Sequence, residues 1–132
     1  MPKKRAILKE NKISTKDLAC RLADIFGDTP KLALTDIRPC FHYDENRNRT
    51  DLVEAYNYTV TDMDTLGSFN VHVTSTTPVI TPEELEEAEE RVFIEFPMNE
   101  TIVKPYRIEF GTATVSIVAP YAQLVNPDNE ED

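Results

Sequence analysis

The chain has 132 residues, of which 40% are hydrophobic and 29% charged, and its formal net charge is −10. This length fits one domain with one hydrophobic core. No apolar run reaches the roughly 18 residues that a membrane-spanning helix needs. The opening run MPKKRAILKENK is basic but lacks the apolar core of a signal peptide, so we expect a cytoplasmic protein without a membrane partner. Cys20 and Cys40 are too few for a disulfide scaffold.

The charge is divided unevenly along the chain. Residues 1–50 carry 11 Lys or Arg and 7 Asp or Glu, a net +4, whereas residues 51–132 carry 3 basic and 17 acidic residues, a net −14. Such asymmetry favours a polyanion contact on one side and an acidic face or tail on the other. A solubilising acidic surface with a basic N-terminus explains the same numbers, so both interpretations stay open.

Residues 1–30 predict a basic arm and one short helix. Residues 1–13 are basic and polar and carry no capping signal. Ser14 and Asp17 have the spacing of a helix cap. The run DLACRLADIF that follows repeats its apolar residues at helical spacing. We therefore expect an amphipathic helix over residues 17–26, ended by Gly27.

From residue 31 the pattern changes to the alternation of strands. Three such runs cover residues 31–44, 52–63 and 68–75. The short turn DTLG between the last two runs makes them an antiparallel hairpin. Pro39 inside the first run indicates an edge, a bend or a bulge.

A second helix and further strands follow. Thr81 can cap a helix that has Pro82 in its first position, and few apolar residues follow, so we expect this helix to be mostly solvated. Strand patterns return at 91–97 and over 102–125. The second of these is either one hairpin around Gly111 or one long bent strand.

Three antiparallel strands, a helix and then the closing strands is the order of the OB-fold, a small, partly open Greek-key barrel. We therefore predict a mainly β protein, an OB-like barrel of five to six strands with two helices. One helix belongs to the N-terminal arm and the other lies between strands three and four. The expected organisation is an arm and helix over 1–30, the barrel over 31–125 and an acidic tail over 126–132. Another small α+β sheet fits the same order.

The sequence supplies little for catalysis, so we expect no enzyme, no catalytic residue, no metal and no cofactor. His42 and His72 lie on different predicted strands, and a metal site built on both would need a third ligand. Cys40, His42 and Asp44 alternate along one strand, a pattern more typical of a polar strand face. The chain has only 3 glycines and no glycine-rich phosphate loop.

The sequence offers more of the side chains that nucleic-acid binding needs. OB-folds hold single strands across strands two and three, with aromatic rings stacked on bases and Arg or Lys on phosphates. We predict stacking on Tyr43, Tyr56 and Tyr58. We also place His72 on the groove side of strand three, opposite its apolar residues. Electrostatic capture is predicted for eight basic residues, Lys3, Lys4, Arg5, Lys9, Lys12, Arg38, Arg47 and Arg49.

The order of strands and helix, the basic arm and the acidic end DNEED resemble small OB-fold single-stranded DNA-binding proteins. In particular they resemble the PrgE-like proteins of Gram-positive conjugative plasmids and related mobile elements. The likeness covers residues 31–125 as a pattern of elements. It implies single-stranded DNA binding with little sequence specificity, in the DNA processing of such elements. It also implies self-association through residues 1–26, because an N-terminal extension can reach a neighbouring subunit in that family.

Two other functions fit the sequence. In an assembly protein, the arm and helix would dock into a neighbouring subunit and the aromatic residues would belong to the core. An acidic DNA mimic would instead place its Glu-rich face in the DNA site of a basic partner protein. The sequence leaves open the choice of DNA or RNA, the strandedness and the oligomeric state.

Overall fold

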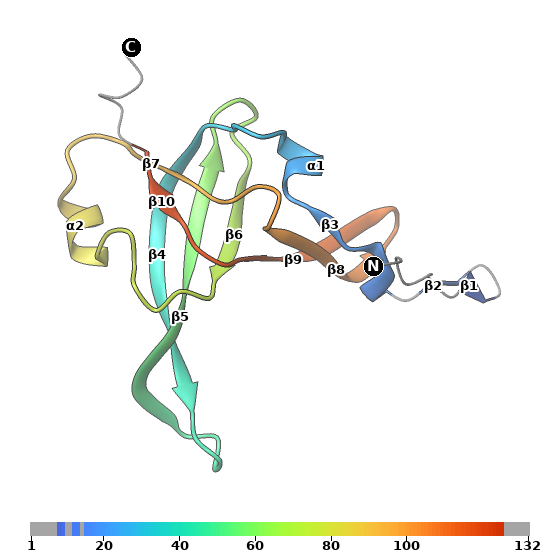
Figure 1. Cartoon of the computed structure of the whole chain (residues 1–132), viewed down its shortest axis with the longest axis horizontal. Helices are drawn as coiled ribbons and strands as arrows, with labels where there is room; N and C mark the ends of the chain where they lie inside the picture. Colours follow the sequence, from blue (N-terminus) through green and yellow to red (C-terminus); the bar gives the residue numbers. More distant parts are fainter. Residues whose placement is uncertain (1–7, 10–11, 14, 126–132) are drawn as a thin grey trace.

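The computed structural model describes residues 8–9, 12–13 and 15–125, which form a mainly β protein (Figure 1). None of the helices within these residues is long and apolar enough to cross a membrane. The predicted tail over 126–132 lies outside the described residues. The elements are β1 (Leu8–Lys9), β2 (Lys12–Ile13), the 3-10 helix η1 (Thr15–Leu18), β3 (Cys20–Arg21), α1 (Ala23–Phe26), β4 (Leu32–Tyr43), β5 (Arg49–Asp62), β6 (Ser68–Val73), α2 (Pro82–Glu87), β7 (Val92–Glu95), β8 (Ile102–Glu109), β9 (Thr112–Ala119) and β10 (Gln123–Leu124).

Eight of the strands form one sheet in the order β10-β7-β4-β5-β6-β9-β8-β3. Neighbouring strands are antiparallel except β6 and β9, which run parallel. The mainly β class and the helix between the third and fourth long strands are confirmed. The outermost described strands, β10 and β3, are not paired with each other, so strand pairing does not close the sheet into the predicted barrel.

The core lies on one face of this sheet. Ile37, Tyr58 and Val71 are register partners across β4, β5 and β6, and all three are buried. Successive residues of a strand point to opposite faces. The next row of partners, Arg38, Asn57 and His72, therefore points out of the opposite face. The predicted orientation of His72 agrees with this arrangement.

The helix predicted over residues 17–26 is wrong. Cys20 and Arg21 form β3 against β8, and the N–H of Leu22 donates to the carbonyl oxygen of Thr101 at 2.8 Å. Leu22 is fully buried, so pairing and burial outweigh the local helical spacing. Of the predicted helix, the end of the 3-10 helix η1 at residues 17–18 and the short α1 remain. As predicted, α1 ends at Gly27, whose φ of 80° lies in the left-handed region.

The start of α2 agrees with the sequence. The hydroxyl of Thr81 accepts a hydrogen bond from the N–H of Glu84 at 3.1 Å, and the Glu84 carboxylate accepts one from the N–H of Thr81 at 3.2 Å. Pro82 occupies the first helical position. No residue of α2 is fully buried, and Leu85 packs only partly against the core. The helix therefore depends strongly on its cap.

Replacing Thr81 by alanine should destabilise the folded protein by about 1 kcal/mol, because the capping box is lost. Thr81→Ser should keep most of the stability, since its hydroxyl can still accept from Glu84. The midpoint of urea unfolding measures both effects. Thr76→Ala, the same truncation at an exposed loop position, is the control. Equal midpoints for the two alanine variants would contradict the role of the cap.

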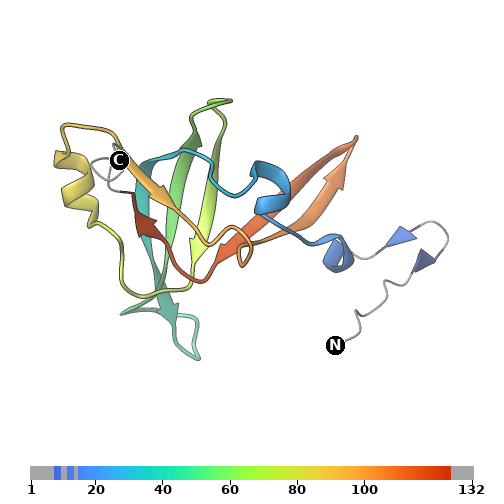
Figure 2. The same ribbon diagram turned by 45° about the horizontal axis from the view of Figure 1, so that its top comes forward.

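Two hairpins extend beyond the rest of the sheet (Figures 1 and 2). In the β4–β5 hairpin, β7 pairs only with 32–34 and β6 only with 56–61, so residues 40–55 form a two-stranded arm. Pro39 lies where β4 is already an edge strand, as a residue without an N–H requires. The second hairpin joins β8 and β9 through Phe110 and Gly111, which decides between the two predicted arrangements of 102–125.

Candidate nucleic-acid interface

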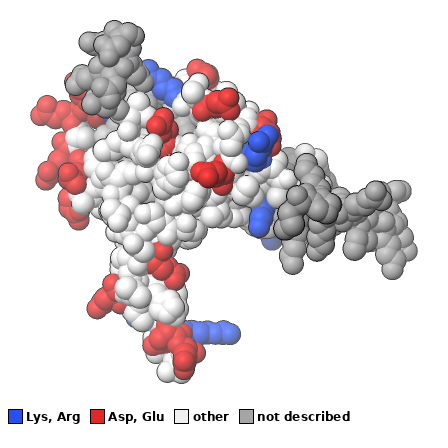
Figure 3. All heavy atoms as spheres, in the orientation of Figure 1, with Lys and Arg blue, Asp and Glu red and all other residues white. Residues whose placement is uncertain are grey.

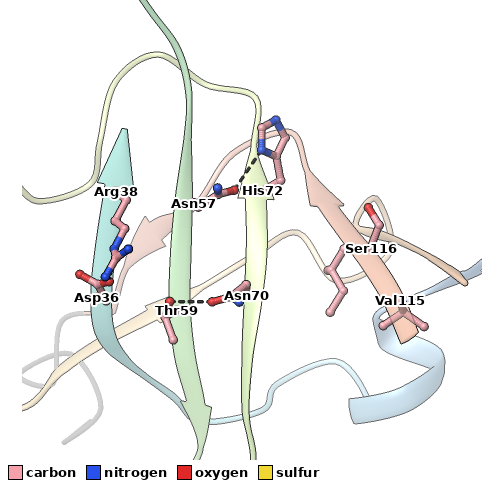
Figure 4. Close-up of a pocket in the computed structure, with 9 residues that line it drawn as sticks. Asp36, Arg38, Asn57, Thr59, Asn70, His72, Val115 and Ser116 are labelled. Atoms are coloured by element: carbon pink, nitrogen blue, oxygen red, sulfur yellow. Dashed lines mark hydrogen bonds and ion pairs between the residues drawn. The ribbon is translucent and has the colours of Figure 1, made fainter. Parts of the chain in front are cut away.

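An open groove of about 520 Å³ lies on the outer face of the central strands (Figure 4). The described pairing of β6 with β9 is confined to His72–Val118 and Val73–Ala119. The groove opens where the two strands diverge from these pairs. We call it the sheet groove, and it is lined by Asp36, Arg38, Asn57, Thr59, Asn70, His72, Val115, Ser116 and Ile117.

The side chains of the sheet groove use their acceptors on one another and leave donors free. The Thr59 hydroxyl donates to Asn70 Oδ1 at 2.6 Å. His72 Nδ1 donates to Asn57 Oδ1 at 3.0 Å, because an amide oxygen can only accept. Among the described residues, the side-chain amide nitrogen of neither asparagine makes a hydrogen bond. The sheet groove therefore presents N–H donors to an acceptor-rich ligand.

Arg38 connects the sheet groove to a second hollow on the arm. Its Nε donates to the Asp36 carboxylate at 2.8 Å, while most of its side chain is exposed. Arg38 also lines the second hollow, which has a volume of about 570 Å³. We call this the arm hollow, and its lining is Arg38, Pro39, Cys40, Phe41, Tyr43, Arg49 and Glu54.

The arm hollow combines flat rings with guanidinium groups. The Arg49 guanidinium carbon lies 3.9 Å from the centre of the Phe41 ring, a cation–π contact. Tyr43 lies near the end of the same strand and is 59% exposed. A base could stack on either surface, since guanidinium planes and aromatic rings both serve as platforms. Arg38, Arg49 and Tyr43, three of the predicted binding residues, therefore line the same hollow.

Two of the predicted stacking residues are placed elsewhere. Tyr58 is only 1% exposed, and its hydroxyl accepts a hydrogen bond from the N–H of Val79 at 3.1 Å. It therefore cannot stack on a base, and the role predicted for it is wrong. Tyr56 is half-buried and packs against the core on the same side. Both rings lie on the core face of β5, which also explains why burial raises the pKa of Tyr58.

The predicted basic residues are spread over several parts of the chain. Arg47 sits in the turn of the arm with a φ of 63°. The Asp44 carboxylate fixes this turn by accepting the N–H groups of Asn46 and Asn48, each at 2.9 Å. Lys9 and Lys12 are register partners in the β1–β2 hairpin, and their side chains lie outside the description. Lys3, Lys4 and Arg5 lie outside the described residues altogether.

Several residues of the sheet groove were not predicted from the sequence, among them Asp36, Asn57, Thr59 and Ser116. Asn57 and Thr59 alternate with the tyrosines and valine of β5. A signal was therefore present: the polar side of a central strand, which in a one-sided sheet faces solvent or a ligand. The stacking residues were predicted from the aromatic side chains, and those of β5 lie on the opposite, core-facing side.

Two pairs of side chains of the types that enzymes use for catalysis lie close together. Cys40 Sγ lies 4.0 Å from His72 Nδ1, but burial, and then the Glu54 charge, raise the pKa of Cys40, so it stays a thiol at neutral pH. His42 Nδ1 is 3.2 Å from the Glu54 carboxylate. Within the described part of the chain, no three His, Cys, Asp or Glu side chains are placed to hold a metal ion.

On the face seen in Figure 3, acidic side chains gather over α2 and over the end of the two-stranded β4–β5 arm. In the sheet groove and the arm hollow, by contrast, Arg38 and Arg49 balance Asp36 and Glu54. These two sites therefore carry little net charge within a chain of net charge −10.

Comparison of the chain with protein-family models, with curated proteins and with solved structures gave no match. What these two sites bind is therefore inferred from the chemistry of the sheet groove and the arm hollow.

Proposed function

We propose that the protein binds single-stranded DNA along a path formed by the sheet groove and the arm hollow. The main support is the set of unused N–H donors in the sheet groove. Arg38 lines both sites and so connects these donors to the Arg49–Phe41 pair of the arm hollow. Phosphate oxygens and base carbonyl oxygens are the acceptors that such a path suits. The rings and guanidinium planes suit unpaired bases, because stacked duplex bases do not expose their faces.

The strand order supports the OB-like arrangement on which this proposal builds. Five strands are neighbours in the sheet in the order β4-β5-β6-β9-β8. The first three are antiparallel, and the one parallel contact joins β6 to β9, which is the last of the five along the chain. In an OB-fold the face of strands two and three binds the ligand, flanked by the loops after strands one and four. The sheet groove lies on β5 and β6, and it is flanked by the two-stranded β4–β5 arm and by the β8–β9 hairpin.

The proposed binding has an electrostatic part and a local part. The basic residues of the N-terminal arm would attract the strand, and Arg38, Arg47 and Arg49 would contact phosphates. Stacking in the arm hollow contributes about 1–3 kcal/mol per base and tolerates any sequence. A role in the DNA processing of conjugative plasmids or mobile elements belongs to the same proposal and rests on the resemblance of the sequence.

Fluorescence anisotropy with labelled oligo-dT and a duplex of equal length, each at two salt concentrations, tests the proposal. We expect tighter binding of the single strand and a marked loss of affinity at higher salt. Equal affinity for duplex, or no binding at low salt, would contradict it. Binding of oligo-rU with the same affinity would show that the protein does not distinguish single-stranded RNA from single-stranded DNA.

Replacing Asn70 by aspartate tests the donor role in the sheet groove. The new carboxylate can still accept from the Thr59 hydroxyl, but it offers no N–H and adds a negative charge. We expect the affinity for oligo-dT to fall about tenfold or more, since hydrogen bonds to charged groups contribute about 1.5–3 kcal/mol. The control is Asn99→Asp, which makes the same change beside Arg21, outside the groove. An equal loss in both variants would point to net charge alone.

A further inference from the structure

The tip of the β8–β9 hairpin carries an aromatic residue in an unfavourable place. Phe110 has a φ of 50° and Gly111 a φ of 81°, and hairpin turns of this kind prefer Asn-Gly. The Phe110 side chain is fully exposed, at 103%. A residue other than glycine in the left-handed region costs about 1–3 kcal/mol, and such strain is common at functional positions. Both features suggest that Phe110 has a partner.

The hairpin below the tip also exposes apolar side chains. Tyr106 is 63% exposed and Ile108 51% exposed. The described pairs between the hairpin and β3 or β6 lie at its base, at residues 102–103 and 118–119. A two-stranded ribbon is only marginally stable alone, so a partner that covers this surface would stabilise it.

A hollow that suits an aromatic ring lies beside β7. It has a volume of about 320 Å³, and Leu32, Ile94 and Phe96 on its wall are buried core residues. A cavity of about 150 Å³ is enough to bind benzene. We call this the β7 hollow, and it is lined by Asp28, Thr29, Pro30, Lys31, Leu32, Phe93, Ile94, Glu95, Phe96, Met98 and Val125.

The tip and the β7 hollow have complementary charges and lie apart. Figures 1 and 2 both show the β8–β9 hairpin pointing away from the side that carries β7 and β10. The tip therefore cannot fill the hollow of its own chain. Arg107 and Glu109 both precede the tip on β8, with Arg107 Nε 3.9 Å from the Glu109 carboxylate. The lining of the hollow includes Asp28, Glu95 and Lys31, so it offers charges of both signs to the two charges of the tip.

We propose that Phe110 of one copy inserts into the β7 hollow of a second copy. Because the two surfaces differ, the contact is head-to-tail, and repetition gives a chain of copies or a ring. This contact does not depend on nucleic-acid binding, and it uses surfaces other than residues 1–26.

Sedimentation velocity of the full chain without nucleic acid, over a wide concentration range, tests the contact. We expect the mean mass to rise with concentration. Phe110→Asn should weaken association at least tenfold without lowering the urea midpoint, because asparagine tolerates the left-handed region. Leu66→Asn is the matched control, since Leu66 is also an exposed apolar turn residue with a positive φ of 63°. It should associate like the original chain.

Mixing two defective chains tests the head-to-tail arrangement. Thr29→Trp changes an exposed residue and should block the hollow. We expect this variant and Phe110→Asn each to be monomeric alone and to form dimers, but nothing larger, when mixed. A monomeric original chain, a Phe110→Asn variant that associates as strongly as the original chain, or two variants that do not associate when mixed would overturn the proposal. So would a Phe110→Asn variant that associates normally and loses only oligo-dT affinity, which would assign the ring to DNA instead.

Discussion

Replacing Tyr58 by alanine should destabilise the folded protein by about 3–5 kcal/mol. The ring is fully buried and meets Phe96 edge-on at 6.3 Å between ring centres. Truncation would leave a cavity in the centre of the sheet and remove the acceptor of the Val79 N–H. Tyr58→Phe keeps the ring and loses only the hydroxyl, so it should cost about 1–3 kcal/mol.

Urea unfolding measures these losses, and Tyr106→Ala is the control because Tyr106 is 63% exposed. A surface substitution of this kind should change stability by no more than about 0.5 kcal/mol. The opposite pattern would place Tyr58 in the binding site: a Tyr58→Ala variant as stable as the original chain but with weak oligo-dT binding. Any loss of DNA binding in an unfolded Tyr58→Ala variant says nothing about stacking.

The sequence was sufficient for features that depend on near neighbours. Thr81 caps α2 as predicted, and the capping box that it forms with Glu84 involves residues only three apart. The turn DTLG between β5 and β6 and the outward position of His72 follow from short-range patterns as well. The apolar alternation gave the mainly β class for the same reason.

Features that depend on distant pairing were not predictable. The helix over 17–26 failed because β3 pairs with β8, some eighty residues later. The groove depends on a β-bulge: strict alternation would put Asp36 and Arg38 on the core face with Leu34. A register shift between Leu34 and Asp36 moves both to the outer face. Nothing in the local sequence reveals that shift, and the divergence of β6 from β9 is equally non-local.

The double variant Arg38→Ala/Arg49→Ala should show the largest loss of single-stranded DNA binding. Arg38 joins the sheet groove to the arm hollow, and Arg49 presents its guanidinium plane above Phe41. Each charged contact contributes about 1.5–3 kcal/mol, so we expect affinity for oligo-dT to fall about a hundredfold or more. Each lost phosphate contact on a single strand should also reduce the slope of log affinity against log salt by about 0.7.

The slope separates local contacts from the general effect of charge. Arg21→Ala/Arg91→Ala removes the same two positive charges from residues that line neither the sheet groove nor the arm hollow. This control should bind with nearly the original affinity and an unchanged slope, because a strand held at the proposed path does not touch those side chains. Equal losses and equal slopes in the two double variants would show that binding responds only to net charge. The path through Arg38 and Arg49 would then be wrong, even if the protein binds single strands.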